Sequence, residues 1–112
     1  MAEYAILLYE DEAEWARRGL EFLQQVSIEH KAFAGANRAA LRCGGWFQPT
    51  STATSVRGGD SSAVPGSMSD ASLALTGYYL IEAADHAAAL AIASQVPVKF
   101  GGVEIRQLVP AS

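Results

Sequence analysis

Cysteine and histidine are scarce in this sequence of 112 residues. Cys43 is the only cysteine, so no disulfide can form within the chain. The two histidines and Cys43 do not show the spacing of zinc ligands, so we expect neither a metal site nor a cofactor. Cys43 follows a predicted helix at a glycine turn, which favours a buried or uninvolved thiol over a nucleophile.

Charged residues are also few. They make up 18% of the chain, and the net charge is −4. Arg17 and Arg18 form the only basic pair, which indicates a solvated helix face rather than nucleic-acid binding. No apolar run approaches the roughly 20 residues that a membrane span needs, and the N-terminal segment is acidic where a signal peptide would be basic. We therefore expect a cytoplasmic protein without nucleic-acid or membrane partners.

Hydrophobic residues, by contrast, make up half of the chain. That share is sufficient for a hydrophobic core and argues against disorder. The length is that of one ordinary domain, and neither a repeat nor an interdomain linker interrupts it. The sequence therefore predicts a single domain over residues 1–112.

The patterns along the chain predict strands and helices in alternation. A long helix is expected over residues 12–41, with weak points at Gly19 and at the Val26-Ser27 step, a bend near Ser27 and a stop at Gly44-Gly45. A second, alanine-rich helix is expected after Asp85, which is suited to cap its N-terminus. Four strands are expected near residues 3–9, 51–57, 73–82 and 103–109.

This order predicts an α+β fold of the ferredoxin-like βαββαβ type. Two helices would cover one face of a four-stranded antiparallel sheet. The first and third strands are apolar on both faces, and Tyr78 and Tyr79 of the third are expected to be core and interface aromatics. Because two helices cover only one face, we expect a second copy of the chain to cover the other, as a homodimer.

His30 is the first candidate for chemistry. It follows Phe22 and Val26 and precedes Phe33 at helical spacing, on an apolar face. A histidine in that position is either a packed core residue or a proton-transfer group that faces a pocket. The residues themselves leave both interpretations open.

Five segments in order resemble the YCII-related family, in its branch named for a DGPF motif. They are "YAILLYEDEAEW", "EHKAFAGANRAA", "FQPTSTATSVR", "GYYLIEAADHAAALAIASQVP" and "GGVEIRQL". The resemblance implies a dimeric α/β barrel, related to muconolactone isomerases and small cofactor-independent monooxygenases. It also implies that His30 matches the histidine for which that family was proposed to be enzymatic.

The chain departs from the family's pattern at two places. The DGPF motif falls on Pro65-Gly66-Ser67-Met68, where only the glycine is kept. The acidic residue that pairs with the family's histidine has no match near Leu41. A backbone carbonyl, Asp70 or Glu104 would have to orient His30 instead.

Several polar residues are candidates for ligand binding. Arg57 ends a predicted strand and can hold a carboxylate, or it is a solvated strand end. Glu104 and Arg106 share one face of the last strand, as a pocket pair or a surface pair. Gln48 and Thr54 lie next to these positions and would orient a ligand.

Two functions follow. The first is a cofactor-independent enzyme in which His30 moves a proton on a small molecule, Arg57 or Arg106 holds an anionic group, and a polar loop over residues 58–70 closes the pocket. The second is a non-catalytic module for a small ligand or a partner on the same fold.

Overall fold

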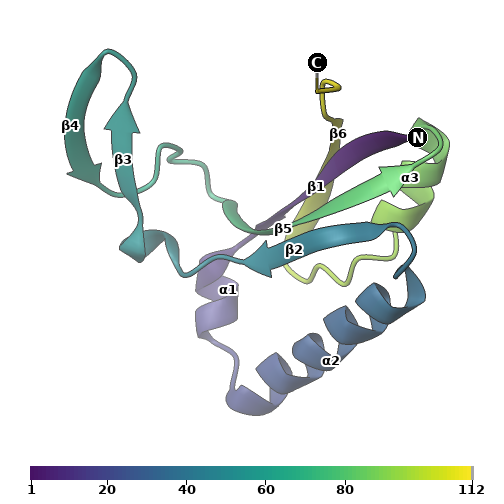
Figure 1. Ribbon diagram of the computed structural model, residues 1–112. Coiled ribbons are helices and arrows are strands. Elements are labelled where there is room, and N and C mark those ends of the chain that lie inside the picture. The colour runs from purple at the N-terminus through teal and green to yellow at the C-terminus, as the bar shows by residue number, and fades with distance from the viewer. Residues whose placement is uncertain (112) are drawn as a thin grey trace.

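The computed structural model describes residues 1–111, and at residues 60 and 61 the backbone only. It is an α+β structure with three α-helices and a four-stranded antiparallel sheet (Figure 1). In chain order the elements are β1 (Ala2–Glu10), α1 (Glu12–Ala16), α2 (Leu20–Ala36), β2 (Leu41–Trp46), the 3-10 helix η1 (Thr50–Thr52), β3 (Thr54–Arg57), β4 (Asp60–Pro65), β5 (Ala74–Ala83), α3 (His86–Ala93) and β6 (Gly101–Gln107).

The main sheet has the order β2-β5-β1-β6, and every neighbouring pair is antiparallel. The first strand thus lies in the middle, with β5 and β6 on its two sides. Ile6 fixes the register, because it faces Tyr79 on β5 and Ile105 on β6. The arrangement is consistent with the predicted ferredoxin-like class.

The strand prediction is wrong for the second strand of this sheet. That strand is Leu41–Trp46, with Gly44 and Gly45 inside it, and not residues 51–57. The sequence pattern predicts a helix stop at these two glycines, which is wrong. A Cβ atom on Gly44 would lie 2.5 Å from Cδ1 of Tyr79, so the glycine permits close packing against the neighbouring strand.

The long predicted helix is confirmed at one of its weak points, since it breaks at residues 17–19 and α2 begins after Gly19. The bend near Ser27 and the stop at Gly44-Gly45 are wrong, because α2 continues through Ser27 and ends at Ala36, where Asn37 caps it. Asn37 donates from its side chain to the carbonyl of Phe33, and its own N–H bonds to the same carbonyl. The predicted cap of the last helix is confirmed, since the Asp85 carboxylate accepts from the N–H of Ala88 at 2.9 Å.

The predicted loop over residues 58–70 is confirmed only in part, since residues 66–70 are irregular but β4 interrupts it. Residues 58–59 make a turn, and β4 then pairs back onto β3 as a two-stranded hairpin. The hairpin stands away from the main sheet (Figure 1). The radius of gyration is 15.5 Å, against about 13 Å for a compact domain of this length.

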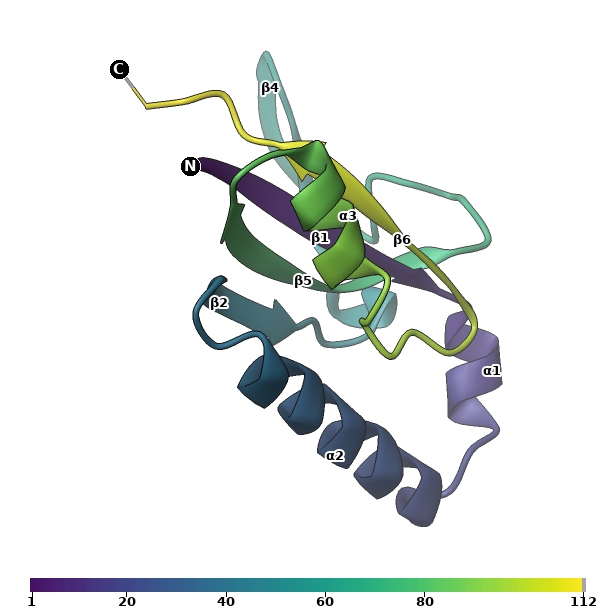
Figure 2. The ribbon, with the colours of Figure 1, turned by 90° about the vertical axis from the view of Figure 1, so that its right-hand side faces the viewer.

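The core lies on one face of the main sheet. Tyr4, Ile6 and Leu8 are almost fully buried there, together with Phe33 of α2 and Ala89 of α3. Figure 2 shows α3 lying over β1 and β6 on this side, with α2 running along β2. We call this the closed face.

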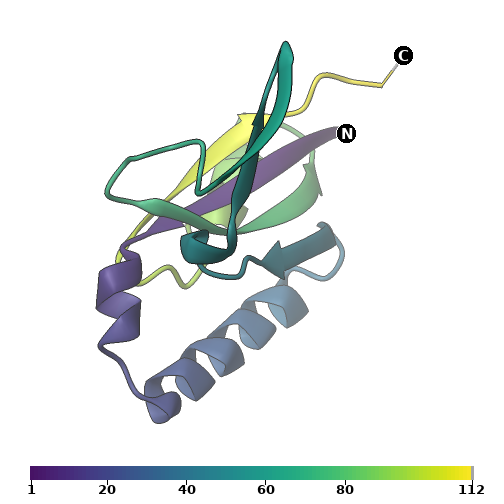
Figure 3. The ribbon, with the colours of Figure 1, turned by 90° about the vertical axis from the view of Figure 1, so that its left-hand side faces the viewer.

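The opposite face is not covered by a helix of residues 1–111 (Figure 3). Leu7, Tyr78 and Leu80 lie on it and are half-buried. We call this the open face. No helix within residues 1–111 has the length and apolar content to cross a membrane.

Candidate functional site

His30 lies on the buried stripe of α2, between that helix and the closed face of the sheet. Val26, His30 and Phe33 are the buried residues of the helix, and their spacing of three to four places them on one side. Only 5% of His30 is exposed. The stripe predicted from the sequence is confirmed, and it leaves the imidazole ring facing β2 and β5.

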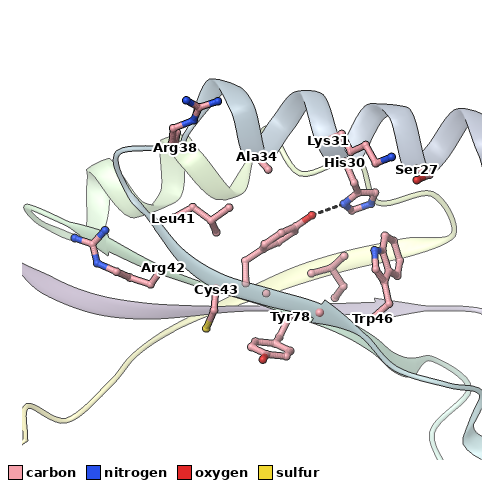
Figure 4. Close-up of a pocket in the computed structure, with 14 residues that line it drawn as sticks. Ser27, His30, Lys31, Ala34, Arg38, Leu41, Arg42, Cys43, Trp46 and Tyr78 are labelled. Atoms are coloured by element: carbon pink, nitrogen blue, oxygen red, sulfur yellow. Dashed lines mark hydrogen bonds between the residues drawn. The ribbon is translucent and has the colours of Figure 1, made fainter.

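The tyrosine that meets this ring comes from β5. The Tyr79 hydroxyl lies 2.6 Å from Nδ1 of His30 (Figure 4, dashed line). Tyr79 also packs on Phe33, with ring centroids 4.9 Å apart, and Trp46 meets His30 edge-on at 4.3 Å. Neither of the expected carboxylates, Asp70 and Glu104, holds His30; the Tyr79 phenol contacts Nδ1, and a backbone carbonyl, that of Pro97, also acts on the ring.

Burial lowers the pKa of His30 below its usual value, and it raises the pKa of Tyr79. The Pro97 carbonyl and the charges of Glu10 and Glu29 oppose the shift at His30. Near neutral pH the pair therefore consists of an uncharged imidazole and an intact phenol. Nε2 is buried, and no group among the described residues meets it with full hydrogen-bond geometry, although the Pro97 carbonyl favours the charged ring and so raises the pKa.

A cavity of about 520 Å³ opens beside this pair, between α2 and β2. We call it the His30 cavity. Its volume is in the range of small-molecule sites, and Leu8, Ala34 and Leu41 supply apolar wall. The charged residues along it are Lys31, Arg38 and Arg42, and no acidic residue is among its described lining residues (Figure 4).

A second cavity, of about 690 Å³, lies further toward the start of α2. We call it the Trp15 cavity. It shares Ser27 and Trp46 with the first, so the Trp46 side chain stands between the two. Glu10 is buried at its floor and accepts hydrogen bonds from Nε1 of Trp15, the hydroxyl of Thr76 and the backbone N–H of Lys99.

The sequence-predicted ligand residues lie elsewhere in the single chain. Gln48, Thr54 and Arg57 are exposed on the segment after β2 and on the hairpin. Glu104 and Arg106 lie on the open face, with an exposed contact of 3.7 Å between their charged groups. None of the five is among the described residues that line either cavity. The structure brings Glu104 and Arg106 together but does not bring them to His30.

Sequence reasoning missed the residues that surround His30. Tyr79 was expected to be a core aromatic, although its alternation with Ile81 places it on the helix side of β5. Lys31 and Arg38 are seven positions apart, a spacing that would place them on a common side of the predicted helix, whereas in the structure Arg38 lies just beyond the end of α2. Cys43 is exposed rather than buried.

No group of three or more metal-binding side chains occurs among the residues that the structure describes. The comparison with family models finds no match to this chain, and the comparison with curated proteins finds no significant one.

Proposed function

We propose that this protein is a cofactor-independent enzyme that uses the His30–Tyr79 pair for proton transfer on a small molecule. The observation that carries the proposal is the 2.6 Å contact between Nδ1 and the phenol at the wall of the His30 cavity. Two titratable groups whose pKa values are shifted by burial, in contact beside a cavity of ligand size, are typical of acid–base sites.

The two side chains would act in sequence. Nε2 is buried, so the tyrosine is the group through which the pair reaches a ligand. The phenol oxygen would take a proton from the ligand while the phenol proton moves to Nδ1 of the neutral imidazole. The products would be a ligand anion and an imidazolium, and return of the proton to another atom of the ligand would complete an isomerisation.

We further propose that the chain has the ferredoxin-like fold of the YCII-related family and pairs as a dimeric α/β barrel. The support is the open face, where apolar side chains of β1 and β5 are half-buried in the single chain. A second sheet packed about 10 Å away would bury them, and a stable interface removes at least about 1,000 Å². Light scattering should give twice the chain mass of 11.8 kDa.

The second candidate is a non-catalytic module that binds a small ligand in the same cavity. Two observations favour this candidate. Nε2 of His30 lacks a hydrogen-bond partner among the described residues, and no carboxylate among them holds the ring. In that case His30 and Tyr79 would shape the wall of the cavity, and neither would transfer a proton.

Solvent-hydrogen exchange separates the two candidates. Wild-type protein is incubated in D2O with a panel of enolisable 2-oxo acids and unsaturated carboxylates, and deuterium uptake is followed by proton NMR. An enzyme catalyses exchange in at least one compound, and His30→Gln and Tyr79→Phe each reduce the rate by about 100-fold or more. Tyr9→Phe, outside the described lining of both cavities, is the matched control and should retain the rate. Exchange that both site variants retain, or exchange with no compound, would assign the cavity to binding alone.

A further inference from the structure

The two cavities along α2 are sorted by charge. The His30 cavity is lined by Lys31, Arg38 and Arg42, whereas the described charged residues of the Trp15 cavity are Glu10 and Glu12. The chain as a whole has 8 basic and 12 acidic residues. A cavity lined by three cations and no described acidic residue therefore differs from the average charge composition of the chain. Neighbouring cavities of opposite character distinguish the two ends of any ligand that spans them.

The cationic end is available to an anion. Lys31 and Arg38 form no ion pair with the described part of the chain, and both are exposed. Arg42 is paired with Glu82 at 2.9 Å and also donates to the carbonyl of Ala39. Three cations along one cavity, two of them without an ion pair among the described residues, favour a carboxylate over a neutral group.

The acidic end disfavours an anion without offering a free site for a cation. Glu10 is 1% exposed and already accepts three hydrogen bonds. Glu12 accepts from the backbone N–H and the hydroxyl of Thr50, at the start of η1. With these carboxylates satisfied, the uncharged lining is hydroxyl groups and a larger apolar and aromatic surface. The hydroxyl groups come from Ser27, Thr50, Ser51 and Thr76, and the apolar surface comes mainly from Trp15, Leu23, Val26, Trp46 and Phe47.

The cavities adjoin, so one molecule can occupy both. They share Ser27 and Trp46, and on α2 their lining runs from Leu23 to Ala34, a distance of about 16 Å along the helix axis. Trp46 is 52% exposed and contacts His30 through ring packing only, with no hydrogen bond from its side chain among those described. The His30–Tyr79 pair lies on the cationic side of this partition.

We propose that the ligand is an elongated carboxylate with an apolar, aromatic arm. Its carboxylate lies in the His30 cavity, within the positive field of Lys31, Arg38 and Arg42, its arm occupies the Trp15 cavity past Trp46, and its middle lies against Tyr79. The proposal rests on the proposed function for the part played by Tyr79, but the orientation of the ligand is a matter of binding and can be tested without turnover.

The test uses three probes: 6-phenylhexanoate, its primary amide, and hexanoate. The two tryptophans of the chain are the reporters, because both line the Trp15 cavity. Their indole N–H signals in a ¹H–¹⁵N NMR spectrum are assigned with Trp46→Phe. We expect 6-phenylhexanoate to shift both indole signals and to bind about threefold to tenfold more tightly than its amide. Hexanoate should leave the Trp15 signal unmoved.

Paired variants test each end. Lys31→Gln with Arg38→Gln should remove the preference for acid over amide, while Arg57→Gln with Arg106→Gln makes the same charge change at the residues predicted from sequence and should keep it. Ala16→Phe fills the Trp15 cavity from α1 and should abolish the advantage of 6-phenylhexanoate over hexanoate. Ala13→Phe, an exposed residue of the same helix outside the described lining, is its control.

The outcomes separate the ligand from the chemistry. Equal affinity of acid and amide, or loss of the preference only in the Arg57 and Arg106 control, would overturn the proposed orientation whatever the exchange assay shows. The expected probe pattern without any solvent-hydrogen exchange would support the orientation and reject the proposed catalysis.

Discussion

The two faces of the main sheet have nearly the same chemistry and different surroundings. On β1, Tyr4, Ile6 and Leu8 point to the closed face and are no more than 2% exposed. Between them, Ala5 and Leu7 point to the open face and are half-buried. A strand that is apolar on both sides is typical of a buried sheet, yet the described helices lie against one side only.

Two adjacent tyrosines of β5 show the consequence most clearly. Tyr79 faces α2, bonds to His30 and lines the His30 cavity. Tyr78, one residue earlier, projects to the other side and stacks on Phe47 at 5.9 Å. Residue type is therefore a poor guide to role here, because alternation along the strand decides which side chain meets a titratable partner.

The largest expected difference in stability is between two aspartate substitutions, one on each face of the main sheet. Ile6→Asp places a carboxylate at a fully buried position, which costs several kcal/mol and a large part of a typical folding free energy. Leu7→Asp should keep the fold and halve the mass in light scattering, because it charges the proposed dimer interface. Circular dichroism with urea unfolding measures the first effect. If Leu7→Asp also unfolds the chain, the open face belongs to the core of one chain.

The glycines of β2 provide a second matched pair. Gly44→Ala would bring a Cβ atom within 2.5 Å of the Tyr79 ring and 2.9 Å of the Tyr78 carbonyl. We expect a loss of about 1–3 kcal/mol, as for other overpacked sites, together with displacement of Tyr79 from His30. At Gly45 the nearest atom, on the Tyr78 ring, would be 3.4 Å away, so Gly45→Ala should be nearly neutral. Thermal unfolding of both variants makes the comparison, and equal losses would show that Tyr79 is not held by close contact with Gly44.

Removal of one hydroxyl should have a smaller effect. Tyr79→Phe deletes the 2.6 Å contact with Nδ1 of His30 and should cost about 1 kcal/mol in the free energy of unfolding. Tyr78→Phe removes a hydroxyl for which no hydrogen bond is described and should change stability by a few tenths of a kcal/mol. Urea unfolding of the two variants is the measurement. A larger loss in Tyr78→Phe would reverse the assignment of the two faces.

The pH dependence of stability should show the smallest effect. Burial lowers the pKa of His30 from its usual value near 6.5, while Glu10, Glu29 and the Pro97 carbonyl partly cancel the shift. Below pH 6.5 the unfolded chain binds a proton at this residue before the folded chain does. The contribution of His30 to stability is therefore complete above pH 6.5 and is lost as the pH falls toward the lowered value.

The free energy of unfolding, measured from pH 7.5 to 5.5, should accordingly fall less steeply in His30→Gln than in the wild type. If His30→Gln has the same slope as the wild type, burial does not hold the imidazole in its uncharged form below pH 6.5.

The elements were predictable where local patterns decide them. The apolar strands near residues 3–9, 73–82 and 103–109 are confirmed within one or two residues at each end. The prediction of the second strand of the main sheet is wrong. Residues 51–57 favour extended structure, but this propensity does not specify which strand they pair with. That segment pairs with β4, and the glycine-rich segment at Gly44 takes its place in the sheet.

The candidate site was predictable only in part, for a similar reason. His30 was found because helical periodicity places it on a buried stripe. Arg57, Glu104 and Arg106 were proposed to converge on it because they fall at strand ends or on a shared strand face. A sequence pattern shows which residues share a face of a strand, but not which face a helix covers. The prediction therefore placed the cations of the site on the strands and not at Lys31 and Arg38.

By itself the sequence determined the class of structure, the buried side of α2 and the two apolar sides of β1, since all of these follow from periods of 3.6 and 2 along the chain. Only the tertiary structure decided that Tyr79 rather than an acid meets His30, that Gly44 lies inside a strand, and that cations and carboxylates line separate cavities on either side of Trp46. The contact between Tyr79 and His30 joins residues 49 positions apart, and the hydrogen bonds to Glu10 join residues up to 89 positions apart. They depend on strand pairing and on the position of α2 against the sheet, which no local pattern specifies.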